Sequence, residues 1–250
     1  MSSPHRVGLI VPSSNTTMET ELPALLGRHA SAAFTFHSSR AVLHTVDPGS
    51  LRQMVDQVDR CSAEVADAAV DVIAYACLIA IAAQGPKAHQ EAEERIAAGA
   101  RRAGCPAPVT SSAGALVRGI EALGLSRVAM VTPYVKPLTS CLVDYVTDYG
   151  VTVTDALSLE VADNLEVGRL DPARLPDHVE RLDLSGAEAI VLSACVQMPS
   201  LAAIEAVEER FGLPVLTAAT ATAREVLCAL GVDPVVPGGG ALLRPLRAAS

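Results

Sequence analysis

Two cysteines occupy matching places in the chain, and both are candidates for chemistry. Cys77 closes the apolar run that begins after Asp71, and Cys195 closes a similar run that begins at Ala189, 118 residues later. Both runs are short and rich in apolar residues, which is typical of buried strands. Ligands bind at the carboxyl ends of strands in parallel α/β sheets. If the two halves of the chain face each other, both thiols therefore reach one site.

A thiol acts as a nucleophile or a proton carrier through its thiolate form. We expect each cysteine at the point where a strand ends and a helix begins, and the positive end of a helix lowers the pKa of a nearby thiol. A single cysteine of this kind is more often a small core residue, but the repetition favours a role in catalysis. The other four cysteines fall in helix-like or connecting segments and are expected to be ordinary core residues: Cys61, Cys105, Cys141 and Cys228.

No metal or cofactor motif accompanies the two thiols. The sequence contains no CxxC pair, no Cys/His spacing typical of zinc and no GxGxxG dinucleotide motif. It also lacks a Ser-His-Asp pattern. Two thiols without such partners suit proton transfer or nucleophilic addition next to a carboxylate. We therefore expect neither a metal nor a cofactor.

Uncharged hydrogen-bond donors are expected at the same edge of the sheets. They are Ser13, Ser14, Asn15, Thr16, Tyr134 and Asn164. Amide, hydroxyl and helix N-terminal N–H groups can hold a carboxylate without a buried Arg or Lys. The alternative is ordinary helix capping, which we expect for Thr16 and Thr17 more than for Asn15.

The elements that carry these residues repeat over almost the whole chain. We expect strands at 6–11, 34–42, 71–77 and 108–112 in the first half, and at 127–132, 151–159, 189–195 and 214–218 in the second. Helices are expected between them, including 18–26, 49–69, 87–103, 172–182 and 200–211, and glycines 124 and 231 are helix stop signals. The pattern predicts an α/β fold with two pseudo-symmetric halves, each a mostly parallel four-stranded sheet flanked by helices, and, if the halves face each other, a site between them.

Composition agrees with this architecture and excludes several classes of partner. Half of the residues are apolar and only 3% are aromatic, which is typical of an Ala, Val, Leu and Ile core. A net charge of −9, with 19 scattered basic residues, argues against nucleic acid and anionic membrane surfaces as partners. The sequence shows neither an apolar stretch of roughly 18 residues nor a signal-peptide pattern. We therefore expect a soluble, cytoplasmic protein.

The residues around both cysteines resemble those of a known family. The segments Val11–Thr16, Tyr75–Cys77 and Ser193–Cys195, together with Tyr134 and Asn164, are similar to the maleate cis-trans isomerases of the aspartate/glutamate racemase superfamily. This resemblance covers roughly the whole chain. Arylmalonate decarboxylases of the superfamily have glycine at the position of Cys77, whereas its racemases also keep two cysteines.

The resemblance implies the isomerisation of maleate to fumarate without a cofactor. In that reaction Cys77 would attack an olefinic carbon, and the succinyl-cysteine adduct would rotate about its C2–C3 single bond before elimination. Asn15, Tyr134 and Asn164 would hold the two carboxylates. Cys195 would give and retrieve a proton or help to shape the site. The remaining substrate-binding residues that the resemblance implies are Ser14, Leu78 and Val196.

The resemblance also implies a discontinuous first domain, 1–113 with 221–250, and a second domain, 114–220. It suggests a place in nicotinate degradation, and we expect a homodimer. A cofactor-independent racemase or decarboxylase of a small amino or malonic acid is the alternative. A third hypothesis is a non-catalytic sensor that binds a dicarboxylate and uses its thiols for a redox response.

Overall fold

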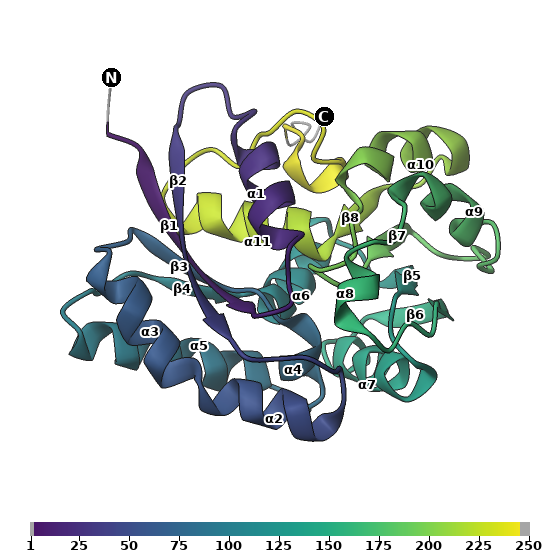
Figure 1. Cartoon of the computed structure of the whole chain (residues 1–250). Helices are drawn as coiled ribbons and strands as arrows, with labels where there is room; N and C mark the ends of the chain where they lie inside the picture. Colours follow the sequence, from purple (N-terminus) through teal and green to yellow (C-terminus); the bar gives the residue numbers. More distant parts are fainter. Residues whose placement is uncertain (1–2, 246–250) are drawn as a thin grey trace.

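Two four-stranded sheets, one in each half of the chain, form the frame of the computed structural model, which describes residues 3–245 (Figure 1). The first sheet has the order β2-β1-β3-β4 and the second the order β6-β5-β7-β8, and all their pairings are parallel. The strands are β1 (His5–Pro12), β2 (Phe34–Ala41), β3 (Val72–Tyr75), β4 (Val109–Ser111), β5 (Arg127–Thr132), β6 (Thr152–Ser158), β7 (Ala189–Ser193) and β8 (Val215–Thr217). The predicted fold class is confirmed.

Helices join the strands and cover the sheets. They are α1 (Met18–Leu26), α2 (Pro48–Asp56), α3 (Val58–Asp67), α4 (Leu78–Ala82), α5 (Ala88–Arg102), α6 (Ser112–Ala122), α7 (Lys136–Thr147), α8 (Asn164–Val167), α9 (Leu175–Val179), α10 (Ile204–Phe211) and α11 (Ala218–Ala229). Short 3-10 turns lie at Pro172–Arg174, Leu201–Ala203 and Ala241–Leu243. Every residue of β3 and β7 is buried, which explains their continuous apolar sequences, because interior strands of a covered parallel sheet have two buried faces.

Three predicted helices differ from the observed ones. The helix expected at 49–69 is divided at Gln57, whose N–H bonds to the carbonyl of Met54, three residues back instead of four. The helix expected at 172–182 begins as a 3-10 turn and ends at Val179. The helix expected at 200–211 begins only at Ile204. There the N–H groups of residues 200 and 201 bond to the carboxylate of Glu21 in α1 instead of starting the helix.

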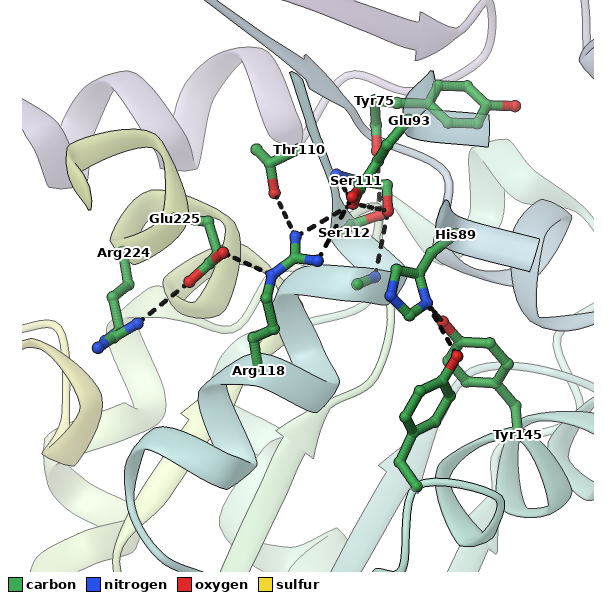
Figure 2. A network of polar contacts seen from close by, with 12 residues as sticks. Tyr75, His89, Glu93, Thr110, Ser111, Ser112, Arg118, Tyr145, Arg224 and Glu225 are labelled. Carbon is green, nitrogen blue, oxygen red and sulfur yellow. Dashed lines mark hydrogen bonds and ion pairs between the residues drawn. The ribbon is translucent and has the colours of Figure 1, made fainter. Parts of the chain in front are cut away.

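The last α-helix of the described residues returns to the first half of the chain. α11 contacts α1, α6, β3 and β4, and it lies beside α1 in Figure 1. Figure 2 shows the polar side of this contact, where the guanidinium of Arg118 in α6 lies between Glu225 of α11 and Glu93 of α5, at 2.6 and 3.1 Å. One arginine thereby links α5, α6 and α11, of which α11 is distant from the other two in sequence.

The expected domain boundaries fall inside helices. The boundary at 113/114 lies in α6, and the boundary at 220/221 lies in α11. Residues 1–2 and 246–250 of the expected first domain lie outside the described residues. The division into 1–113 with 221–250 and 114–220 stays a prediction.

Candidate active site

The expected site residues follow the carboxyl ends of strands in both sheets. Cys77 lies two residues after β3 and Cys195 two residues after β7, while Asn15, Tyr134 and Asn164 follow β1, β5 and β6. All five side chains are buried, with Cys77 4% and Cys195 6% exposed. The two halves meet here directly, because Thr45 and Asp163 form an antiparallel bridge between the loops after β2 and β6.

Cys77 is the N-cap residue of the short helix α4. A bond from the backbone N–H of Ala80 favours its thiolate, but burial is the larger effect and raises the pKa of Cys77 to about 12. The nearby Cys195 makes a smaller contribution to this increase in the pKa. The prediction of a thiol with a lowered pKa is therefore wrong for the resting site, because removal from water disfavours the charged form more than one short helix favours it.

Cys195 has more partners than Cys77, although no α-helix begins directly after it. The backbone N–H of Gln197 lies 3.4 Å from its sulfur, and the N–H of Met198 and the hydroxyl of Tyr134 also bond to it. These contacts lower the pKa of Cys195, whereas burial, the largest effect, raises it above its ordinary value. Tyr134 also donates to the carbonyl of Ala194 at 3.3 Å. Both thiols are thus neutral at rest, and Cys195 has the better-stabilised thiolate.

In the side-chain amide of Asn15, the oxygen makes hydrogen bonds and the nitrogen does not. Its Oδ1 accepts from the N–H groups of Thr17 and Met18 at 3.0 and 2.9 Å, at the start of α1. Its Nδ2 is buried and has no hydrogen-bond partner. Buried donors are normally satisfied, so this group is available to a bound acceptor. The expected capping by Thr17 is wrong, because the Thr17 side chain makes no capping bond and Asn15 takes that role.

Asn164 extends the site from the second half. It is the first residue of α8, a helix that the sequence did not predict and that Asp163 caps through the N–H groups of residues 165 and 166. The Asn164 Nδ2 donates to the Ser14 hydroxyl at 2.7 Å, and that hydroxyl donates to the Leu43 carbonyl at 2.6 Å. Leu78 and Val196, which directly follow the two cysteines, are also buried.

Gln197 is a buried side chain of this region that sequence reasoning missed. Its amide contacts the backbone of residues 14, 16, 17 and 164, which places it between the two halves. The sequence signal for this residue is its position two residues after Cys195. Glutamine side chains are mostly exposed to solvent, so a glutamine next to a buried strand end is unusual.

The polar side chains that these strand ends bring together carry no formal charge. Arg40 is placed nearby, but its guanidinium contacts the carbonyl of Asn15 and the carboxylate of Glu19. An anion bound here would be held by amide, hydroxyl and backbone donors. Within residues 3–245, no group of three His, Cys, Asp or Glu side chains is placed to hold a metal ion, and no helix is long and apolar enough to span a membrane.

The remaining cysteines and a second polar cluster lie apart from this site. Cys61 and Cys105 are buried as expected, whereas Cys141 is only half-buried and Cys228 is exposed, so these two are not core residues.

Figure 2 shows His89 of α5 pointing at the Tyr145 hydroxyl, 2.6 Å away. A cavity of about 570 Å³ beside His89 is lined by neither Cys77 nor Cys195.

Comparison with known proteins finds relatives over the full length of the chain. A family model described as arylmalonate decarboxylase matches residues 7–243. A maleate isomerase from Geobacillus stearothermophilus is 51% identical over 247 residues, which cover 97% of this chain and 98% of the relative.

Two solved structures are similar in sequence and in fold. A cysteine-to-serine mutant of the Nocardia farcinica maleate cis-trans isomerase, with a covalently bound succinylcysteine intermediate, is 50% identical and has a TM-score of 0.95, with 97% of this chain and 99% of that chain covered. A cysteine-to-alanine mutant of the Pseudomonas putida S16 maleate isomerase, with maleate, is 48% identical at a TM-score of 0.95, with 96% and 98% covered.

Proposed function

We propose that this chain, which belongs to the arylmalonate decarboxylase family and within it to the maleate isomerases, converts maleate to fumarate through a succinyl-cysteine intermediate. The observation that carries the proposal is the position of two buried thiols, Cys77 and Cys195, among uncharged hydrogen-bond donors. One of these donors, the Asn15 Nδ2, has no hydrogen-bond partner. A relative of 50% identity and nearly identical fold holds a covalent succinylcysteine. The function follows from these two facts together.

Cys77 is assigned the attack. Its sulfur forms a bond to one olefinic carbon of maleate, and the π electrons move onto the carboxylate of the other carbon. Charge that develops there is stabilised by fixed donors in a site from which water is excluded. The unpartnered Nδ2 of Asn15 is a donor of this kind. The Tyr134 hydroxyl has one hydrogen, which points to the Ala194 carbonyl at rest, and it becomes a second donor when that hydrogen turns to the substrate.

Cys195 is assigned the proton. Its thiol protonates the second olefinic carbon, and the proton released by Cys77 restores the Cys195 thiol, so the net change is the addition of one S–H across the double bond. The three bonds to its sulfur, from Tyr134 and two backbone N–H groups, support this division because they stabilise the transient thiolate. Cys77 has one such bond.

The adduct has a single C2–C3 bond, so it can rotate before the same steps run in reverse. Cys195 then takes the proton from carbon while its own proton returns to the Cys77 sulfur, which leaves as a thiol to give fumarate. Asn15 comes from the first half and Asn164 from the second, and we assign one carboxylate to each side. Ser14 positions Asn164, while Leu78 and Val196 complete the wall around the two thiols.

The proposal is tested by incubating the purified protein with maleate. Fumarate should appear in the NMR spectrum without loss of carbon dioxide, which separates an isomerase from a decarboxylase. Intact mass after quenching should show the addition of one maleic acid, and peptide mapping should place it on Cys77. Absence of fumarate refutes the function. Fumarate formation with an adduct that persists in Cys77→Ala refutes the assignment of the nucleophile.

We propose three finer points of biology, of which only the place in a degradation pathway rests on the family resemblance. They are a homodimer, a cytoplasmic location and a place in nicotinate degradation. The two-domain division proposed above is supported by the return of α11 to the first sheet. Light scattering of the purified protein decides the oligomeric state.

A further inference from the structure

The Gln197 side chain makes four hydrogen bonds to segments that carry the site. Its Nε2 donates to the Ser14 carbonyl at 3.0 Å and to the Asn164 carbonyl at 2.8 Å. Its Oε1 accepts from the N–H groups of Thr16 and Thr17, at 3.0 and 3.4 Å. The side chain is 2% exposed. One amide therefore joins the loop after β1 in the first half to the start of α8 in the second.

These contacts use all the hydrogen-bonding capacity of the side chain. A primary amide has two N–H donors and an oxygen with two lone pairs, and each is occupied. Nothing is left for a substrate. The amide of Asn15 is different, because its Nδ2 is free. Gln197 can therefore affect chemistry only through the groups that it holds.

The surrounding chain is fitted to this amide. A Cβ on Gly168, the residue that ends α8, would lie 2.6 Å from the Gln197 Nε2, closer than real contacts allow. The φ of Gly168 is −69°, a value open to any residue. A side chain at this position would therefore displace the Gln197 amide from the place that it occupies.

Gln197 is also tied to one of the two thiols. Its own backbone N–H lies 3.4 Å from the sulfur of Cys195, two residues earlier. Gln197 therefore contacts the loop that carries Asn15 and the backbone of Asn164 through its side chain, and the Cys195 thiol through its own backbone.

We propose that Gln197 is a positioning residue, which sets the distances between Asn15, Asn164 and Cys195 across the two halves of the chain. This inference rests on the proposed isomerase function. A displacement of about 1 Å in a catalytic group can reduce turnover on the order of 100-fold. We therefore expect Gln197→Met, which keeps the length of the side chain and removes all four bonds, to lower kcat by roughly ten- to 100-fold.

Gln197→Glu gives a sharper test because its defect should depend on pH. The introduced carboxylate would face two carbonyl oxygens in a buried position, so its pKa should be raised above about 4.3. Protonation restores one donor toward a carbonyl. The ratio of kcat for Gln197→Glu to that of the wild type should therefore increase as the pH is lowered from mildly alkaline to mildly acidic. The same ratio for Gln197→Met should stay constant.

Gln57 provides a matched control. Its half-buried amide also makes four bonds, to Val42, Gln53 and Arg60, but it contacts none of residues 14–17, 164 or 195. Gln57→Met and Gln57→Glu should keep kcat within about twofold of the wild type at every pH, whatever they do to the melting temperature. A wild-type kcat in Gln197→Met, or a constant ratio for Gln197→Glu, overturns the inference.

Hydrogen exchange separates this inference from the proposed function. Gln197→Met should speed exchange of the Thr16 amide, whose N–H bonds to the Gln197 Oε1, and Gln57→Met should not. If the wild type fails to turn over maleate, the proposed function fails, while unchanged exchange at Thr16 refutes the positioning role independently.

Discussion

Substitution of Asn15 can separate the two uses of its amide, which caps α1 through Oδ1 and offers a free donor at Nδ2. A serine at this position has a hydroxyl oxygen that can accept from the same backbone N–H groups, since Ser and Asn both form such local bonds. It has no group that reaches as far as Nδ2. Asn15→Ser should therefore keep the cap and lose the donor, and Asn15→Ala should lose both.

The expected magnitudes follow from these contacts. A hydrogen bond to a charged partner contributes about 1.5–3 kcal/mol, and each 1.36 kcal/mol of transition-state stabilisation corresponds to roughly a tenfold rate difference. Both variants should therefore lose about 10- to 150-fold in kcat/KM for maleate. Loss of a helix cap costs about 1 kcal/mol of unfolding free energy, or about 2–4 °C in Tm for a chain of this size. That decrease should be seen in Asn15→Ala and be largely absent in Asn15→Ser.

Initial rates of fumarate formation and thermal melts followed by circular dichroism measure the two quantities on the same samples. The decisive comparison is between the two variants, because a residue that only caps would show activity falling in step with stability. A kcat/KM in Asn15→Ser equal to that of the wild type would refute the reasoning. It would mean that the free Nδ2 does not meet the substrate.

Three further predictions concern the thiols and a buried carboxyl. Because burial raises the pKa of Cys77 to about 12, alkylation of this residue by iodoacetamide should be slow at neutral pH and accelerate about tenfold per pH unit in the alkaline range; a rate independent of pH would contradict the neutral resting thiol. Cys195→Ala should slow turnover and still form the Cys77 adduct with maleate, as seen by intact mass, since the attack uses the Cys77 sulfur and completion uses the Cys195 proton; an unmodified Cys77 would argue against this division. Burial raises the pKa of Glu21 above 4.5, so the wild type is most stabilised by this group below pH 4.5 and loses that stability as the pH rises through the raised value. The Tm of Glu21→Gln minus that of the wild type should therefore increase from about pH 4.5 to neutral pH, and a constant difference would refute the shift.

The framework of the fold was readable from the sequence because its strands are strongly marked. Apolar runs such as Val72–Tyr75 and Ala189–Ser193 are buried on both faces. Strands buried in this way have nearly continuous apolar sequences, so they can be recognised from composition. Helix boundaries were less accurate. The division at Gln57 coincides with a backbone bond that reaches only three residues back, to Met54. The late start of α10 coincides with bonds to Glu21, about 180 residues away.

The site was readable only where a residue type suggested its own chemistry. Cysteines after strands and an asparagine in a loop can be recognised locally. The direction of the thiol pKa shifts could not be, since it depends on how completely the folded chain excludes water from Cys77 and Cys195. The role of Gln197 was equally hidden, because its four partners lie at residues 14–17 and 164 and come together only in the folded protein.

The return of α11 to the first sheet has a consequence for synthesis on the ribosome. The strands β1–β4 emerge first, yet the helix that packs against α1, α6, β3 and β4 spans Ala218–Ala229 and emerges after the strands of both sheets. The nascent chain has already supplied all four strands of the second sheet by residue 217. Because non-local contacts form only after both partners are available, the contacts of α11 with the first sheet form only after all strands of the second sheet have been made. A ribosome that stops at residue 217 releases a chain that has the strands of both sheets and lacks the helix that packs on the first sheet.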